Sequence, residues 1–134
     1  MALGSRADQL AGRYAMYLTI EDHGHAHVLR PTKARLDAAV STEFRNQARE
    51  ALAKGGDVWI VDLAPVSFID SSGIGTLVGL LKLCGRDRRF ELCGMAPTLQ
   101  HVFKLTRMEM IFRIHANVAA ALGAHDPAHR LTAS

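Results

Sequence analysis

A short apolar run, VWIVDL at residues 58–63, constrains the fold more than any other part of the chain. It is rich in branched side chains and bounded on both sides by polar or turn residues, which is typical of a central strand covered on both faces. The segment FIDSSGIG follows at residues 68–75, and apolar residues at helical spacing begin shortly after it. A strand, a loop and a helix in this order predict an α/β domain whose loop lies at the carboxyl end of a central strand.

The other segments extend this unit into a single mixed domain. Residues 13–21 and 26–31 are predicted to be two strands of a hairpin joined by the turn DHGH. Strand and helix then alternate, which favours parallel pairing through right-handed crossovers. We therefore expect a mixed, mostly parallel sheet of four or five strands, an N-terminal β-hairpin and about four α-helices. The later elements are expected as helices at 38–54, 72–83, 96–108 and 117–125 and strands at 58–63, 89–94 and 110–115.

The helix at 72–83 is expected to bury one apolar stripe against the sheet. Its predicted members are Ile74, Leu77, Val78 and Leu81. Leu80 and Leu83 fall off this stripe, so the helix carries surplus apolar surface. Either a neighbouring loop or a partner protein could cover that surface.

Length and composition limit the function classes. A chain of 134 residues suits one domain, which we place at residues 13–123, with flexible extensions at 1–12 and 124–134. No apolar run approaches the roughly 18 to 20 residues that cross a bilayer, and the N-terminus lacks the apolar core of a secretory signal. We therefore expect a cytoplasmic protein without a membrane span.

The charge pattern and the cysteines exclude further classes. The net charge of +3 is spread along the chain among acidic residues, and the one basic cluster, GRDRRF, is a short turn, so no direct nucleic-acid binding is expected. Cys84 and Cys93 form no CxxC pair, which makes a structural zinc or redox motif unexpected.

Histidines of the sequence DHGHAH were also considered as metal ligands. His23, His25 and His27 alternate, and on a regular strand they would point to the same side. A hairpin turn breaks this alignment, and three ligands within five residues cannot easily surround an ion. The sequence therefore assigns no metal site and no cofactor.

Four roles compete for the loop DSSGIG. Asp70 or Ser71 could cap the helix, with Gly73 and Gly75 letting it approach the sheet closely. A dinucleotide fingerprint would need a small residue where Val78 stands, and a phosphate loop would need Gly-Lys-Ser or Gly-Lys-Thr. Neither pattern is present.

A catalytic serine is the third possible role. Ser71 or Ser72 would need a histidine base, for which His101 and His115 are the downstream candidates, but the Gly-x-Ser-x-Gly elbow is absent. The sequence therefore predicts no enzyme.

The fourth role is that a serine is modified. A hydroxyl at a helix N-terminus is accessible, and the helix dipole tolerates a phosphate there. The added charge of about −1.5 to −2 beside Asp70 would repel an acidic or apolar partner, which makes the loop a binding switch.

Three segments together resemble one family. The dipeptide LD before the first helix, VDLAPVSFIDSSGIGTLVGLL, and FELCGMAPTLQHVFKLTRM are similar to the STAS domain, specifically the stand-alone anti-sigma factor antagonists. The resemblance runs from about Tyr14 to Leu122 and is most specific at DSSGIG, the phosphorylation motif of that family.

The resemblance implies a mechanism and a set of residues. The unphosphorylated protein would bind an anti-sigma factor that is also a serine protein kinase and so free a sigma factor or a related response protein. Phosphorylation at Ser71, with Ser72 as the second choice, would release it, and a separate serine phosphatase would reset it. The implied partner contacts are Asp37, Asp70, Ser71, Ser72, Gly73, Ile74 and Thr76. From the residues alone, an N-cap is the favoured role of Asp37.

An alternative function comes from the same family. STAS domains also serve as constitutive interaction subunits, either scaffold parts of stress complexes or regulatory subunits of lipid-transport ATPases. An intact acceptor serine favours the switch.

Two positions depart from the family pattern. Ala34 stands where the family has the glycine of G-x-L-D, which leaves the shape of the loop before Asp37 open. Arg107 replaces the glycine of L-T-G-L, so we expect the helix before it to end differently, without a left-handed cap glycine.

Overall fold

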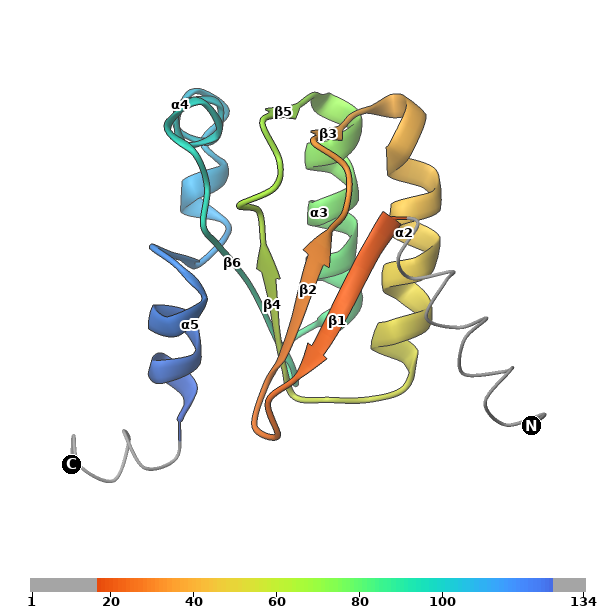
Figure 1. Cartoon of the computed structure of the whole chain (residues 1–134), viewed down its shortest axis with the longest axis vertical. Helices are drawn as coiled ribbons and strands as arrows, with labels where there is room; N and C mark the ends of the chain where they lie inside the picture. The colour runs from red at the N-terminus through yellow and green to blue at the C-terminus, as the bar shows by residue number, and fades with distance from the viewer. Residues whose placement is uncertain (1–16, 127–134) are drawn as a thin grey trace.

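A five-stranded sheet in the order β1-β2-β4-β6-β7 forms the centre of the molecule. The computed structural model describes residues 17–126 (Figure 1). β1 and β2 pair antiparallel, and every other neighbouring pair is parallel, which confirms the predicted hairpin and mixed sheet. The strands span Leu18–Asp22 (β1), His27–Pro31 (β2), Val58–Asp62 (β4), Arg89–Cys93 (β6) and Ile114–His115 (β7).

Helices cover both faces of this sheet. Figure 1 shows α2 and α3 side by side on one side and α5 on the other. The helices of the described residues are Ala38–Ala53 (α2), Ser71–Cys84 (α3), Pro97–Leu105 (α4) and Val118–His125 (α5), with a short 3-10 helix at Met108–Met110 (η1). α5 ends at His125, so it includes the first two residues of the stretch predicted as a tail at 124–134. Residues 127–134 lie outside the described part. The predicted extension 1–12 and residues 13–16 of the first predicted strand lie outside it as well.

Strand β4 shows why the sheet is buried on both faces. Trp59 and Val61 point into the large core beneath α2, α3 and α4, while Val58 and Ile60 point into a smaller core beneath α5. All five residues of β4 are buried, including Asp62 at its end, as the almost wholly apolar sequence predicted. The smaller core consists of Ala26, Val28, Val58, Ile60, Cys93 and Ala121.

The buried stripe of α3 differs from the predicted one. Leu80 is only 1% exposed, so the expectation that it lies off the stripe was wrong, whereas Leu83 is 50% exposed. Apolar residues occupy adjacent positions around this helix, so helical spacing alone does not say which line faces inward. Packing against α2 and the sheet buries the side of the helix that begins at Gly73. The buried residues are Gly73, Thr76, Leu77, Leu80 and Cys84, flanked by partly buried Ile74, Val78 and Leu81.

The end of α4 corrects another expectation. Arg107 adopts the left-handed conformation, with φ 62° and ψ 20°, so the helix has the ending expected of a glycine although an arginine stands there. The chain then turns through η1, and the strand predicted at 110–115 is reduced to β7. Only Met110 of that segment belongs to η1, and residues 111–113 form the turn that leads into β7. Arg107 therefore holds a strained backbone.

Replacing Arg107 with glycine is expected to stabilise the domain by up to about 1 kcal/mol. Glycine adopts the left-handed region without the steric penalty of roughly 1–2 kcal/mol that a side chain brings, and its greater freedom in the unfolded chain offsets part of the gain. Urea unfolding measures the difference. Arg107→Ala is the matched control, because alanine keeps the strain; an equal gain in both variants would show that the arginine side chain, and not the backbone, is responsible.

Candidate functional site

Two very short strands assemble the loop that the sequence singled out. β3 (Arg35–Leu36) and β5 (Phe68–Ile69) pair in parallel, with Leu36 opposite Ile69. The residues that follow each strand therefore lie next to each other, at the N-termini of α2 and α3, and Figure 1 shows both helix ends at the same end of the molecule. Strands of two residues carry no periodicity, and the sequence analysis did not predict them.

Asp70 ties the two helices together. Its Oδ1 atom accepts a hydrogen bond from the backbone N–H of Gly73 at 3.1 Å, which caps α3. Its Oδ2 atom accepts from the backbone N–H of Ala38 at 3.2 Å, in the first turn of α2. One carboxylate thus satisfies a free amide of each helix.

Asp37 is the N-cap of α2, as the residues alone had favoured. Its Oδ1 atom accepts from the N–H of Ala39 at 3.2 Å, and Arg35 Nε donates to its Oδ2 atom at 3.0 Å. The hydrogen bond from Arg35 is the main reason that the pKa of Asp37 lies below its ordinary value. The carboxylate is therefore ionised at neutral pH.

Ser71 and Ser72 are the first two residues of α3, and both are exposed. Because Asp70 caps the helix, the Ser71 hydroxyl is not needed for that purpose. Within residues 17–126 neither serine hydroxyl has a hydrogen-bond partner. Ser71 therefore presents a free hydroxyl next to the capping residue Asp70, at the end of the molecule where α2 and α3 begin.

Gly73 positions this serine. A methyl group on Gly73 would fall on the carbonyl oxygen of Leu36 and against the Ile69 side chain, so only glycine lets the first turn of α3 lie against β3. The expected close approach at Gly75 is not found, because that position faces open space.

The predicted partner contacts divide into two groups. Asp37, Asp70 and Ile74 are partly exposed, and Ser71 and Ser72 are exposed. Gly73 and Thr76 are buried and offer almost no surface to another protein.

Two neighbours of the site, Arg35 and Phe68, could not be located from the sequence. The Arg35 guanidinium lies over the ring of Phe68, 4.1 Å from its centroid, and Phe68 is 40% exposed. Arg35 and Phe68 are opposite each other in the pairing of β3 with β5. Their contact could have been predicted only if that strand pairing had been known. An apolar ring and a cation thus stand beside the serine.

Histidines considered in the sequence have other environments. His101 is exposed on α4, and His115 Nε2 lies 2.7 Å from Glu91 Oε1. Among the described residues no histidine contacts either serine through a hydrogen bond, so no triad is assembled here.

The hairpin histidines do not converge on one point. His23 pairs with Glu21, the His25 ring lies 3.2 Å from the Leu122 carbonyl, and His27 stacks on Trp59.

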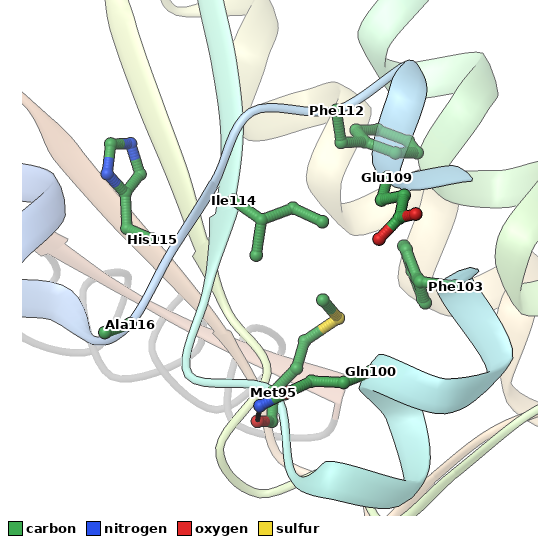
Figure 2. Close-up of a pocket in the computed structure, with 8 residues that line it drawn as sticks. All are labelled: Met95, Gln100, Phe103, Glu109, Phe112, Ile114, His115 and Ala116. Atoms are coloured by element: carbon green, nitrogen blue, oxygen red, sulfur yellow. Dashed lines mark hydrogen bonds between the residues drawn. The ribbon is translucent and has the colours of Figure 1, made fainter. Parts of the chain in front are cut away.

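A separate hollow lies between α4, η1 and β7. Its volume is about 390 Å³, and Figure 2 shows apolar side chains around it. None of the predicted site residues lines it. The lining residues are Met95, Gln100, Phe103, Glu109, Phe112, Ile114, His115 and Ala116.

Fold and site together define a small α/β domain that exposes a serine at the capped N-terminus of a helix beside a central strand. A model of the STAS domain matches residues 17–121, which is most of the chain. The chain belongs to the STAS domain family.

Known proteins resemble it at modest identity. An anti-sigma-B factor antagonist of Listeria monocytogenes is 28% identical over 98 residues, covering 72% of this chain and 86% of that protein. The crystal structure of an anti-sigma factor antagonist from Mycobacterium paratuberculosis superposes with a TM-score of 0.75 at 20% identity, covering 81% of this chain and 92% of that one. The anti-sigma factor antagonist SpoIIAA in its unphosphorylated form gives a TM-score of 0.65 at 22% identity, with coverages of 80% and 95%. The Bacillus protein SpoIIAA is also known in a phosphorylated form.

Within residues 17–126, no helix combines the length and apolar character needed to cross a bilayer.

Proposed function

We propose that this protein is a phosphorylatable anti-sigma factor antagonist that acts by binding and has no catalysis of its own. Its unphosphorylated form binds an anti-sigma factor that is also a serine protein kinase, and thereby frees a sigma factor or a related response protein. The observation that carries the proposal is the exposed Ser71 hydroxyl, left without a hydrogen bond because Asp70 caps the helix. Relatives described as anti-sigma factor antagonists support the same role.

Phosphorylation of Ser71 would change the surface more than the fold. At the first position of α3 the phosphate lies near the positive end of the helix dipole, so the helix can accommodate it. The same phosphate adds about −1.5 to −2 charges beside the carboxylates of Asp37 and Asp70. A partner that packs tightly there is then repelled, or must bury an extra charge. A serine phosphatase would restore the binding form.

The proposed contact surface follows from exposure. It comprises the accessible residues around Ser71 at the joined ends of α2 and α3, and it includes the Arg35 and Phe68 pair. Gly73 and Thr76 serve to seat the helix. The surface residues are Arg35, Asp37, Phe68, Asp70, Ser71, Ser72 and Ile74.

Phosphorylation can be tested without a named partner. Wild-type protein, Ser71→Ala and Ser72→Ala are incubated with Mg-ATP and soluble extract of the source cells, and intact mass is measured. We expect one phosphate on the wild type and on Ser72→Ala and none on Ser71→Ala. Phosphorylated protein should bind the captured kinase at least about tenfold more weakly than unphosphorylated protein.

Other outcomes distinguish the alternatives. If the phosphate is absent only from Ser72→Ala, the switch mechanism still holds, and Ser72 is the phosphorylated residue. If no phosphate appears and both variants retain the same extract partner as the wild type, the switch is wrong, and the domain is a constitutive interaction subunit.

A further inference from the structure

Three side chains converge on the face of the sheet that α5 covers. Glu91 comes from β6, His115 from β7 and His125 from α5. The Nε2 atoms of both histidines lie 2.7 Å from the same oxygen, Glu91 Oε1, and the three ligand atoms lie within 4.8 Å of one another. In Figure 2 the His115 ring points away from the other labelled side chains, on the opposite side of its strand from Ile114.

This cluster is almost closed to solvent. The side chains of Glu91, His115 and His125 are 6%, 10% and 4% exposed. Burial favours protonation and would raise the pKa of Glu91, but the hydrogen bonds from the two histidines outweigh it, and the pKa lies below its ordinary value. The site therefore holds a carboxylate facing two imidazoles, with little water to compete.

These three ligand atoms suit a particular class of metal ions. Two imidazole nitrogens and one carboxylate oxygen suit zinc and neighbouring divalent transition metals, which use this combination with further positions left for water. Bonds of about 2.0–2.2 Å in a tetrahedral site would place the ligand atoms about 3.3–3.6 Å apart. The present oxygen–nitrogen separations of 2.7 Å would thus widen slightly, by small side-chain rotations. Each neutral ring would carry its proton on Nδ1 and direct the Nε2 lone pair at the ion.

Arg113 supports the carboxylate from the other side. Its Nη1 atom lies 3.9 Å from Glu91 Oε2, the oxygen that the histidines do not contact. A cation at that distance orients the carboxylate and leaves Oε1 for a ligand bond, although its charge also opposes a nearby metal ion. Because Arg113 is 60% exposed, solvent screens this repulsion.

We propose that Glu91, His115 and His125 form a binding site for one divalent transition-metal ion of the zinc class, which fastens α5 to the sheet. A metal ion would strengthen the attachment of α5, because the core beneath this helix is small: six buried residues, with Val118 and Leu122 of α5 packed against them. Ligands 24 and 34 residues beyond Glu91 match no metal-binding sequence motif. The pairing of β6 with β7 brings His115 to Glu91, and the packing of α5 adds His125. This proposal does not depend on the phosphorylation of Ser71.

Metal binding is tested on the full chain after dialysis against a chelator. Zn²⁺ titration by calorimetry should give one site per chain with a dissociation constant of about 1 µM or tighter. Co²⁺ should produce the visible absorption of a four- or five-coordinate site, and Zn²⁺ should raise the melting temperature. Glu91→Gln and His125→Gln should weaken Zn²⁺ binding by at least about a hundredfold.

Matched controls test whether Zn²⁺ binds at the proposed site or at the histidines of the hairpin. His101→Gln, and a variant in which His23, His25 and His27 are all replaced by glutamine, should bind Zn²⁺ as the wild type does. Long-range nitrogen–proton NMR of the wild type should show Zn²⁺ shifting the Nε2 signals of His115 and His125, which needs no variant to fold. The proposal is wrong if wild type binds no Zn²⁺ at about 1 mM, if those two signals do not move, or if binding is lost only in the hairpin variant.

Discussion

Replacing Gly73 with alanine is expected to destabilise the domain by about 3 kcal/mol, at the upper end of the usual cost of overpacking. The added methyl group would fall on the carbonyl oxygen of Leu36, and backbone cannot rotate away as a side chain can. The first turn of α3 would have to move off β3. The loss is measured by urea unfolding with linear extrapolation.

Gly75→Ala is the matched control for this substitution. It lies on the same helix two residues later, and a methyl group there meets no atom within 4 Å. Alanine should therefore stabilise the helix by about 0.5–1 kcal/mol. If both alanine variants changed the free energy of unfolding in the same direction, close contact at Gly73 would not be the cause.

Gly73→Ala also has a functional consequence under the proposed switch. Moving the first turn displaces Ser71, its first residue, while Gly75→Ala leaves it in place. Phosphorylation by the extract should fall in the first variant, at a temperature where it is still folded, and persist in the second.

Replacing Asp70 with alanine is expected to cost about 2 kcal/mol, because it removes the cap of α3 and a hydrogen bond to the first turn of α2 together. Both helix N-termini lose a hydrogen-bond acceptor, so the N–H groups of Gly73 and Ala38 must hydrogen-bond to water instead. Asp70→Asn should cost less, since its amide oxygen can still accept from Gly73.

Asp37→Ala provides the comparison for Asp70→Ala. Asp37 accepts a backbone hydrogen bond from α2 alone, so its replacement should destabilise less than Asp70→Ala. Thermal and urea unfolding of the three variants give the order directly. A loss in Asp70→Ala no larger than that in Asp37→Ala, which also removes the hydrogen bond from Arg35, would contradict the expected order.

The elements predicted well are those with a strong local signal. β4 is apolar at nearly every position, and the helix cap at Asp37 was visible as a polar residue before an apolar repeat. The left-handed Arg107 was not predicted, because only the packing of η1 against the end of α4 requires that conformation.

At the candidate site, the DSSG motif and its place before a helix were evident from the chain alone. Sequence could not say that Asp70, and not Ser71, would cap the helix, since both side chains can accept the same hydrogen bond. Nor could it show that Asp70 reaches α2 or that Arg35 covers Phe68. Those contacts depend on the pairing of β3 with β5, which joins residues about thirty positions apart.

By itself, the sequence determined the order and type of the main elements, the mixed sheet and the serine-bearing loop, because hydrophobic spacing and capping residues act over a few neighbouring positions. Tertiary structure alone decided which line of α3 is buried, which residues surround Ser71, and that Glu91, His115 and His125 meet beneath α5. Each of these depends on contacts between distant segments, whose register is set by packing across the sheet and leaves no local pattern.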